Sequence, residues 1–155
     1  MGTRRGAVLG QVTGRKGTGC VSHLRVLIGD DDDRVRRCLR TLLSQQCDID
    51  VVGEASEGSD LLDAVRSLRP DRVLVDVQMP GSEGLELVRR IKNAHPSVSV
   101  IVLSVYADQL TEALRAGAGH YLLKGCPMDE LLRALRNPCC ERPRAMAAVN
   151  ARGIS

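Results

Sequence analysis

The stretch RVLVDVQMPG, residues 72–81, decides how the rest of the chain is interpreted. An apolar run ends on the carboxylate of Asp76, and a turn containing Pro80 and Gly81 follows at once. A short apolar run bounded by turn signals is typical of a strand that is buried on both faces. Open α/β sheets place their chemistry where such strands leave the sheet, which makes Asp76 a candidate functional residue. Taken alone, a solvated loop carboxylate is the alternative.

Apolar periodicity divides residues 24–136 into strand-like and helix-like segments that alternate along the chain. Alternation of this kind predicts right-handed βαβ units and an α/β fold of the flavodoxin-like, doubly wound type, with a five-stranded parallel sheet and five helices. We expect strands over 24–28, 49–55, 72–76, 98–103 and 119–124. We expect helices over about 35–43, 61–68, 85–91, 107–116 and 127–136, the fourth of which ends at Gly117.

One domain is predicted over residues 23–137. Residues 1–22 are rich in Gly, Thr and basic residues and predict a disordered lead, while residues 138–155 predict a short tail. The formal net charge is +3, but residues 24–136 hold 15 Lys/Arg and 18 Asp/Glu, a net charge of −3. A domain that binds nucleic acid is expected to be basic over one face, so we predict no direct binding of nucleic acid.

The residue types also argue against other classes of function. The chain has no Phe or Trp and two Tyr, which leaves little for base stacking on aromatic rings. Its six Cys form no CxxC pair and are interpreted as reduced cytosolic thiols, with a redox role for the vicinal pair Cys139-Cys140 as the minor alternative. No apolar stretch approaches the roughly 20 residues that span a bilayer. We therefore expect a cytoplasmic protein without a membrane partner.

Polar side chains follow four of the predicted strands. Asp30 and Asp31 come after the first strand, Asp76 after the third, Ser104 after the fourth and Lys124 at the end of the fifth. Because parallel strands end at one edge of a sheet, we expect these side chains to lie together. Carboxylates beside a hydroxyl and an ammonium suit Mg²⁺ and a phosphate-sized anion. Asp76, central in the sheet, would be the nucleophile that becomes an aspartyl phosphate.

The acidic run Asp30-Asp31-Asp32-Asp33 needs something to offset its mutual repulsion. The positive N-terminal end of the following helix, together with capping, accounts for one or two of the four carboxylates. A divalent cation would offset the others. The run thus points to the same metal site as the strand ends.

Taken together, these residues resemble the receiver domain of two-component response regulators, and the resemblance covers residues 24 to about 136. It implies a sheet order of 2-1-3-4-5. The segments EALRAGA (112–118) and YLLK (121–124) further resemble the NarL/FixJ branch, whose receivers usually precede a LuxR-type helix-turn-helix domain; no such sequence follows Arg136. The residues that carry the resemblance are Asp30-Asp31, Asp76, Met79-Pro80-Gly81, Gly84, Ser104, Tyr121 and Lys124.

The resemblance implies a role for each acidic residue. Asp76 is the expected phospho-acceptor, with a sensor histidine kinase as the donor and partner. Asp31 is expected to bind Mg²⁺ directly and Asp30 to help directly or through water. The backbone carbonyl of Gln78 is expected to complete the protein's share of the metal ligands. Such a domain is not an enzyme in the usual sense. It is itself the phospho-acceptor, and it promotes its own phosphorylation and dephosphorylation.

The resemblance also implies a conformational switch. Ser104 and Lys124 are expected to bind the phosphoryl group, and Tyr121 is the aromatic expected to swing inward when Ser104 moves toward the phosphate. The switch biases a surface between two states, here the fourth helix, the fifth strand and the fifth helix. That surface would serve a protein partner or a homodimer, in keeping with a role in transcriptional signalling.

Some positions depart from the family pattern. Asp32 and Asp33 replace the His-Pro or similar pair common in this branch; they either tighten Mg²⁺ binding or solvate a helix start, and we favour the latter. Gln78 and Tyr106 occupy positions that tune the access of hydrolytic water, and a bulky Tyr106 suggests slow loss of phosphate.

Two functions of other classes remain as alternatives. One is an interaction module with this fold that works without phosphorylation, against which the complete acidic set, Ser104 and Lys124 argue. The other is a haloacid-dehalogenase-type phosphatase, disfavoured because no acidic residue lies two positions after Asp76.

Overall fold

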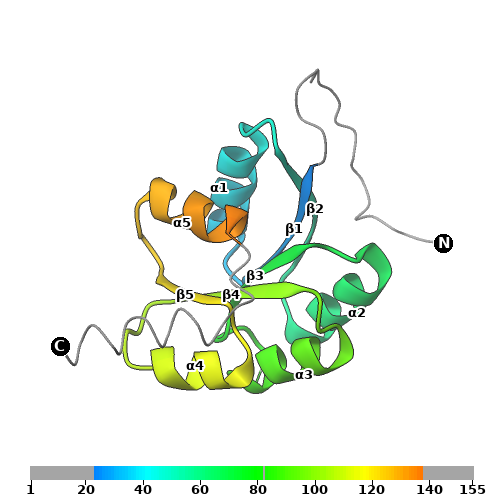
Figure 1. Cartoon of the computed structure of the whole chain (residues 1–155), viewed down its shortest axis with the longest axis vertical. Coiled ribbons are helices and arrows are strands. Elements are labelled where there is room, and N and C mark those ends of the chain that lie inside the picture. Colours follow the sequence, from blue (N-terminus) through cyan, green and yellow to red (C-terminus); the bar gives the residue numbers. More distant parts are fainter. Residues whose placement is uncertain (1–22, 82, 138–155) are drawn as a thin grey trace.

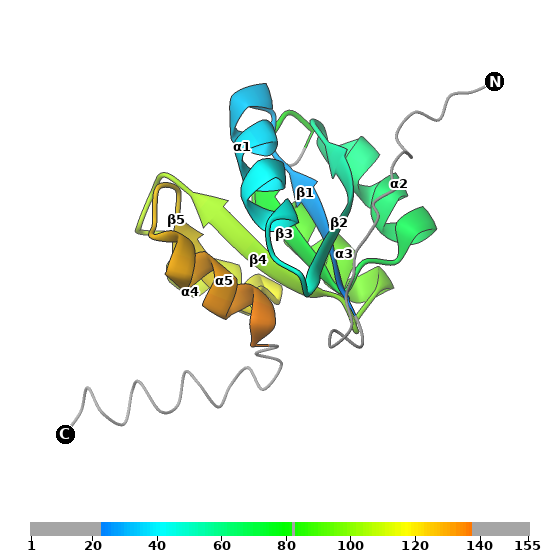
Figure 2. The same cartoon turned by 90° about the horizontal axis from the view of Figure 1, so that it is seen from above.

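A computed structural model describes residues 23–81 and 83–137 of the chain. The elements alternate in the order β1 (Leu24–Gly29), α1 (Asp33–Ser44), β2 (Ile49–Ala55), α2 (Gly58–Leu68), β3 (Arg72–Asp76), α3 (Glu86–Ala94), β4 (Ser99–Ser104), α4 (Leu110–Ala116), β5 (His120–Leu123) and α5 (Met128–Arg136). The strands pair in parallel in the order β2-β1-β3-β4-β5. The predicted fold class and sheet order are both confirmed. Figure 2 shows β5 at the edge of the sheet remote from β2.

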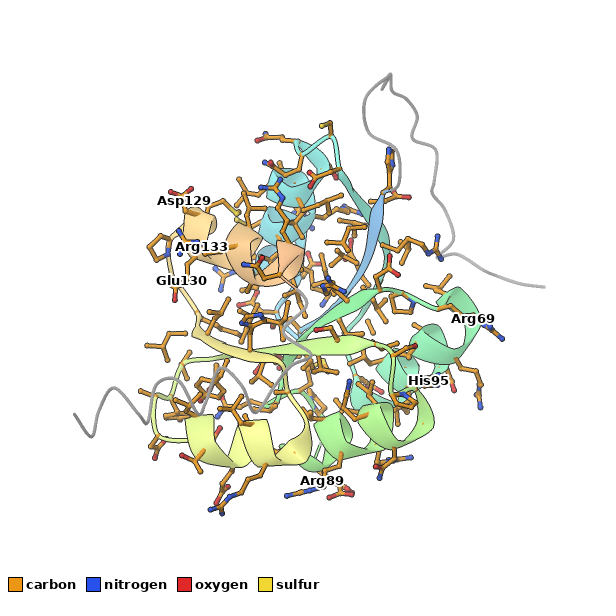
Figure 3. All side chains as sticks on the ribbon, viewed as in Figure 1. Arg69, Arg89, His95, Asp129, Glu130 and Arg133 are labelled. Carbon is orange, nitrogen blue, oxygen red and sulfur yellow. The ribbon has the colours of Figure 1, made fainter. Side chains whose placement is uncertain are left out.

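The sheet lies between two layers of helices. Figure 1 shows α1 and α5 on one side of the sheet and α2, α3 and α4 on the other. The charged side chain of Arg89 on the outer surface of α3 points away from the sheet in Figure 3. Since helices cover both faces, the strands are buried on both sides, which explains why they are apolar runs rather than alternating polar and apolar residues.

The central strand β3 divides the core into two parts. Val73 and Val75 pack in the cluster that includes residues of α2, α3 and α4, whereas Leu74 packs in the cluster that includes residues of α1 and α5. All three side chains are fully buried. Successive side chains of a strand point to opposite faces, so this short apolar run contributes to both clusters. The strand is thereby fixed in place, and Asp76 at its end is fixed with it.

One predicted helix begins later than expected. The fourth helix was predicted from about residue 107, but α4 starts at Leu110, and its first helical hydrogen bond runs from Ala113 N to Gln109 O at 2.9 Å. The backbone of the preceding segment bonds to side chains and not within a helix: Tyr106 N donates to Ser104 Oγ, and Tyr106 O accepts from the Tyr121 hydroxyl. The predicted end of this helix at Gly117 is confirmed, with Gly117 at φ 112°.

The two flanking segments that the sequence predicts, residues 1–22 and 138–155, lie outside the described residues, as does Cys139-Cys140. The domain bounds 23–137 therefore stay a prediction. Across residues 23–81 and 83–137, none of the helices combines the length and the apolar character needed to cross a membrane.

Candidate functional site

The ends of β1 and β3 bring three carboxylates together. The two strands are neighbours, with Gly29 opposite Val75, so the residues that follow them leave the sheet at the same edge. One oxygen from each of Asp30, Asp31 and Asp76 lies within 4.8 Å of the other two. Asp30 and Asp76 are buried, while Asp31 is exposed. The prediction that these three side chains lie close together is confirmed.

Lys124 reaches the same point from the end of β5. Its backbone N–H donates to Ser104 O at 2.8 Å, which continues the pairing of β5 with β4 by one residue. Its Nζ lies 2.8 Å from Asp30 Oδ2 and 2.9 Å from Asp76 Oδ2. The ammonium is therefore shared by two buried carboxylates, and its side chain stays 22% exposed at the rim of the site.

The charges at this point are not balanced by the protein alone. Burial by itself would lower the pKa of Lys124, but hydrogen bonds and charge interactions with Asp30 and Asp76 outweigh it, so its pKa lies above the ordinary value. Burial raises the pKa of Asp30, and the attraction of Lys124 only partly opposes this effect. Three carboxylates converge here and one ammonium contacts two of them, so the site favours additional positive charge.

The other two residues of the acidic run belong to the start of α1. Asp32 is the N-cap, and its Oδ1 accepts a hydrogen bond from Arg34 N at 2.9 Å, a contact that lowers the pKa of Asp32. Asp33 pairs with Arg36 and Arg37. This arrangement agrees with the expectation that both residues serve a helix start, and it leaves Asp30 and Asp31 for a cation.

The site fits Mg²⁺. Carboxylate oxygens are the ligands that Mg²⁺ prefers, and three of them converge here. Asp30 Oδ2 is buried and accepts no well-aligned hydrogen bond from any described residue, although it contacts the Lys124 ammonium. A buried carboxylate oxygen whose contact among the described residues is one shared ammonium is suited to bind a cation as well. Asp76 Oδ1 accepts a hydrogen bond from Gln78 N at 2.9 Å, whereas the expected role of the Gln78 carbonyl stays a prediction.

Ser104 and Tyr121 are connected through the backbone of Tyr106. Ser104 is fully buried, and its Oγ accepts the N–H of Tyr106 at 3.0 Å. The carbonyl of the same Tyr106 accepts the hydroxyl of Tyr121. The family resemblance implied Ser104 and Tyr121 as a switch pair but did not imply that Tyr106 joins them. A single residue carries both bonds, so a displacement of Ser104 has a direct route to Tyr121.

Large exposed hydrophobic side chains lie beside this connection. In the described part of the chain they are Val105 and Tyr106 after β4, Leu110 at the start of α4 and Leu123 at the end of β5, exposed by 43% to 59%. All four belong to the fourth-helix and fifth-strand side of the molecule. This side is also where the expected switch surface lies.

Fold, carboxylate cluster and strand-end lysine together define a receiver domain. Comparison with protein families agrees, since residues 26–136 match the response regulator receiver domain. The chain belongs to this family.

Individual relatives make the match more specific. The chain is 39% identical over 115 residues to the response regulator GacA of Pseudomonas viridiflava, a match that covers 73% of the chain and 54% of that protein. The chain thus spans about half the length of the curated relatives it matches. Among solved structures, it resembles the response regulator domain of Thermotoga maritima CheB, with 30% identity, a TM-score of 0.70 and coverage of 76% and 96% of the two chains. It also resembles RcsB of Salmonella enterica serovar Typhimurium, with 32% identity, a TM-score of 0.67 and coverage of 74% and 66%.

Proposed function

We propose that this receiver domain accepts a phosphoryl group on Asp76 from a phosphohistidine of a sensor histidine kinase, in a reaction that requires Mg²⁺. The observation that carries the proposal is the position of the Asp76 carboxylate. It lies at the end of the central strand, beside two further carboxylates and in contact with the Lys124 ammonium. Asp30, Asp31 and Asp76 would hold the ion, with the Gln78 carbonyl as the predicted additional ligand.

The transfer itself is a displacement at phosphorus. A carboxylate oxygen of Asp76 forms the new P–O bond while the P–N bond to the histidine breaks, and the departing ring nitrogen keeps the electron pair and is protonated by solvent. Mg²⁺ in the site would neutralise charge on the transferring phosphoryl oxygens. Lys124 contributes a second positive charge at the same place, since its Nζ lies 2.9 Å from Asp76. The protein mainly positions groups and stabilises charge, so it promotes its own phosphorylation without being an enzyme in the usual sense.

Ser104 is proposed to bind the phosphoryl group and to report its presence. Its hydroxyl accepts the Tyr106 N–H, so a movement of Ser104 toward Asp76 lengthens or breaks that bond. The carbonyl of Tyr106 also accepts the Tyr121 hydroxyl, so a movement of Tyr106 would displace the hydrogen-bond partner of Tyr121 at the same time. The bulky side chain of Tyr106 is half-exposed next to the site, in keeping with the proposed slow loss of phosphate.

The output is proposed to be a protein contact on the fourth-helix and fifth-strand side of the molecule. The exposed Val105, Tyr106, Leu110 and Leu123 supply apolar surface there. A homodimer or a separate partner in transcriptional signalling would use this surface. RcsB was solved bound to the promoter rprA, but residues 24–136 of this chain carry a net negative charge, and we propose that they do not bind nucleic acid directly. A cytoplasmic location is part of the same proposal.

The direct test is the intact mass of the protein after incubation with acetyl phosphate, with and without Mg²⁺. The wild type should gain one phosphoryl group only in the presence of the ion, and Asp76→Asn should gain none. Asp108→Asn removes an exposed carboxylate of the β4–α4 connection and should be phosphorylated like the wild type. If a folded wild type gains no mass, the phosphorylation-independent interaction module becomes the better interpretation.

A further inference from the structure

Arg36 of α1 contacts the turn that carries the metal-binding carboxylates. Its side chain is only 16% exposed. Nη1 donates to the backbone carbonyl of Asp30 at 2.7 Å, Nε donates to Glu54 Oε1 at 3.2 Å and Nη2 donates to Asp33 Oδ1 at 2.9 Å. These partners belong to the residue after β1, to β2 and to the first turn of α1. One planar guanidinium therefore fixes three parts of the chain relative to one another.

The contact with Asp30 completes a set of bonds that orients this residue. Its N–H donates to Ala55 O at 3.0 Å, and its Oδ1 accepts the N–H of Asp32 at 2.9 Å. With the carbonyl held by Arg36, the polar atom left over is Oδ2, the oxygen that lies beside Lys124. The bonds thus hold one carboxylate oxygen toward the site and occupy the other polar groups of the residue.

Arg36 also keeps another carboxylate occupied. Asp33 pairs with Arg36 and Arg37, and the carboxylates that converge within 4.8 Å in the described residues are those of Asp30, Asp31 and Asp76. The guanidinium of Arg36 is thus bound on both sides, by the Asp30 carbonyl and by the Asp33 carboxylate, which fixes its position beside Asp30.

We propose that Arg36 is a positioning residue for Mg²⁺ binding, an inference that rests on the proposed function. Its support for Asp30 matches the way that outer partners of metal ligands fix ligand geometry, and loss of such partners costs about 10- to 100-fold in metal affinity. Simple electrostatics gives the opposite expectation. Arg36 is a cation near a cation site, so its removal would tighten Mg²⁺ binding if charge were all that mattered. Weaker Mg²⁺ binding after removal of Arg36 would indicate a positioning role, whereas tighter binding would indicate that only its charge matters.

Arg40 provides a matched control. Arg40 pairs with Glu54, as Arg36 does, and its Nη1 lies 3.0 Å from Glu54 Oε2. Its side chain is 55% exposed, and no contact between Arg40 and Asp30 is found in the described residues. Arg40→Met removes the same charge from the same helix while the support of Asp30 stays. We expect Arg40→Met to bind Mg²⁺ as the wild type does or slightly more tightly.

The experiment is a titration with Mg²⁺ alone, followed by the amide resonances of residues 29–31 and 76–78 in ¹⁵N–¹H spectra of the full chain. The spectra also report whether each variant is folded. We expect Arg36→Met to bind Mg²⁺ at least about tenfold more weakly than the wild type. Arg36→Lys keeps the charge but cannot reproduce the three-way contact, so it should also bind more weakly. If Arg36→Met does not fold, Arg36→Lys decides the question.

The possible outcomes distinguish this inference from the proposed function. Mg²⁺ affinity in folded Arg36→Met equal to or tighter than that of the wild type overturns the positioning role. An equal loss of affinity in Arg40→Met overturns it as well, because that variant leaves the contact with Asp30 in place. A wild type that does not bind Mg²⁺, or an Asp31→Asn variant that binds it as well as the wild type, overturns the proposed function instead.

Discussion

Replacing Lys124 by Met is expected to destabilise the fold, and the loss should depend on Mg²⁺ and on pH. The substitution keeps a flexible apolar side chain of similar length but removes the ammonium that lies 2.8 Å from Asp30 and 2.9 Å from Asp76. Both carboxylates are almost completely buried, with 1% and 3% exposure. Removal of one member of a buried ion pair leaves an uncompensated buried charge, which typically costs about 3–5 kcal/mol.

The cost of protonating a carboxylate sets an upper limit on this loss of unfolding free energy. A buried carboxyl group can escape the penalty by binding a proton, and from an ordinary pKa of 3.8 this costs about 4.4 kcal/mol at pH 7 and about 1.6 kcal/mol at pH 5. The 22% exposure of Lys124 lets water reach the pair and lowers the cost somewhat. We therefore expect Lys124→Met to lose about 2–4 kcal/mol of unfolding free energy at pH 7 in EDTA, and less at pH 5.

The assay is urea unfolding followed by circular dichroism, with EDTA or with saturating Mg²⁺, because the ion replaces the missing positive charge and should restore part of the loss. Lys92→Met is the control, since Lys92 Nζ donates to the carbonyls of Pro96 and Val98 at 2.8 and 2.7 Å. Its loss should be the same in both buffers. A loss in Lys124→Met that Mg²⁺ and pH leave unchanged would refute the reasoning.

Three further predictions concern stability, each measured by urea unfolding. Hydrogen bonding to Arg136 lowers the pKa of Asp48, so the contribution of this pair is present above the ordinary pKa of 3.8 and is lost as pH falls through the lowered pKa. Asp48→Asn should lose about 0.5–1 kcal/mol at pH 7, because both side chains are more than a third exposed, and progressively less as pH falls below 3.8. Gly117→Ala should lose about 1–3 kcal/mol, since Gly117 has φ 112° and an added Cβ would lie 2.8 Å from Lys92 Cγ; an unchanged midpoint would show that this turn relaxes. Leu74→Ala should lose about 2–5 kcal/mol because Leu74 is fully buried, and a smaller loss would mean that the two helices over it collapse into the space.

The features of the fold that could be predicted from the sequence are those encoded by local patterns. The apolar run of residues 73–75 predicted a strand buried on both faces, and its side chains do pack in two separate clusters. The rule that parallel strands end at one edge predicts that Asp30, Asp76 and Lys124 lie together, and the distances among them agree. Their chemical roles stay predictions until phosphorylation and metal binding are measured.

The features that could not be predicted depend on contacts between distant residues or on backbone groups. Periodicity marks Arg36 only as a charged residue on a helix, and nothing local indicates that it reaches Glu54 on β2 and the carbonyl of Asp30. The late start of α4 has a similar origin, because the backbone of Tyr106 is bound by Ser104 and Tyr121 instead of joining the helix. Side-chain to backbone bonds of this kind compete with helix formation, and the sequence pattern does not reveal which wins.

The acidic site opposes stability and supports function for the same physical reason. Burial raises the pKa of Asp30, which means that its ionised form is less favourable in the folded state than in the unfolded one. The contribution of this group to stability is therefore greatest below its ordinary pKa and is lost as pH rises through the raised value. Ionisation of Asp30 is therefore a cost to the metal-free fold, and a cation that binds beside it would relieve this cost. The strain that Asp30 imposes on the metal-free domain is thus expected to become part of the affinity for Mg²⁺.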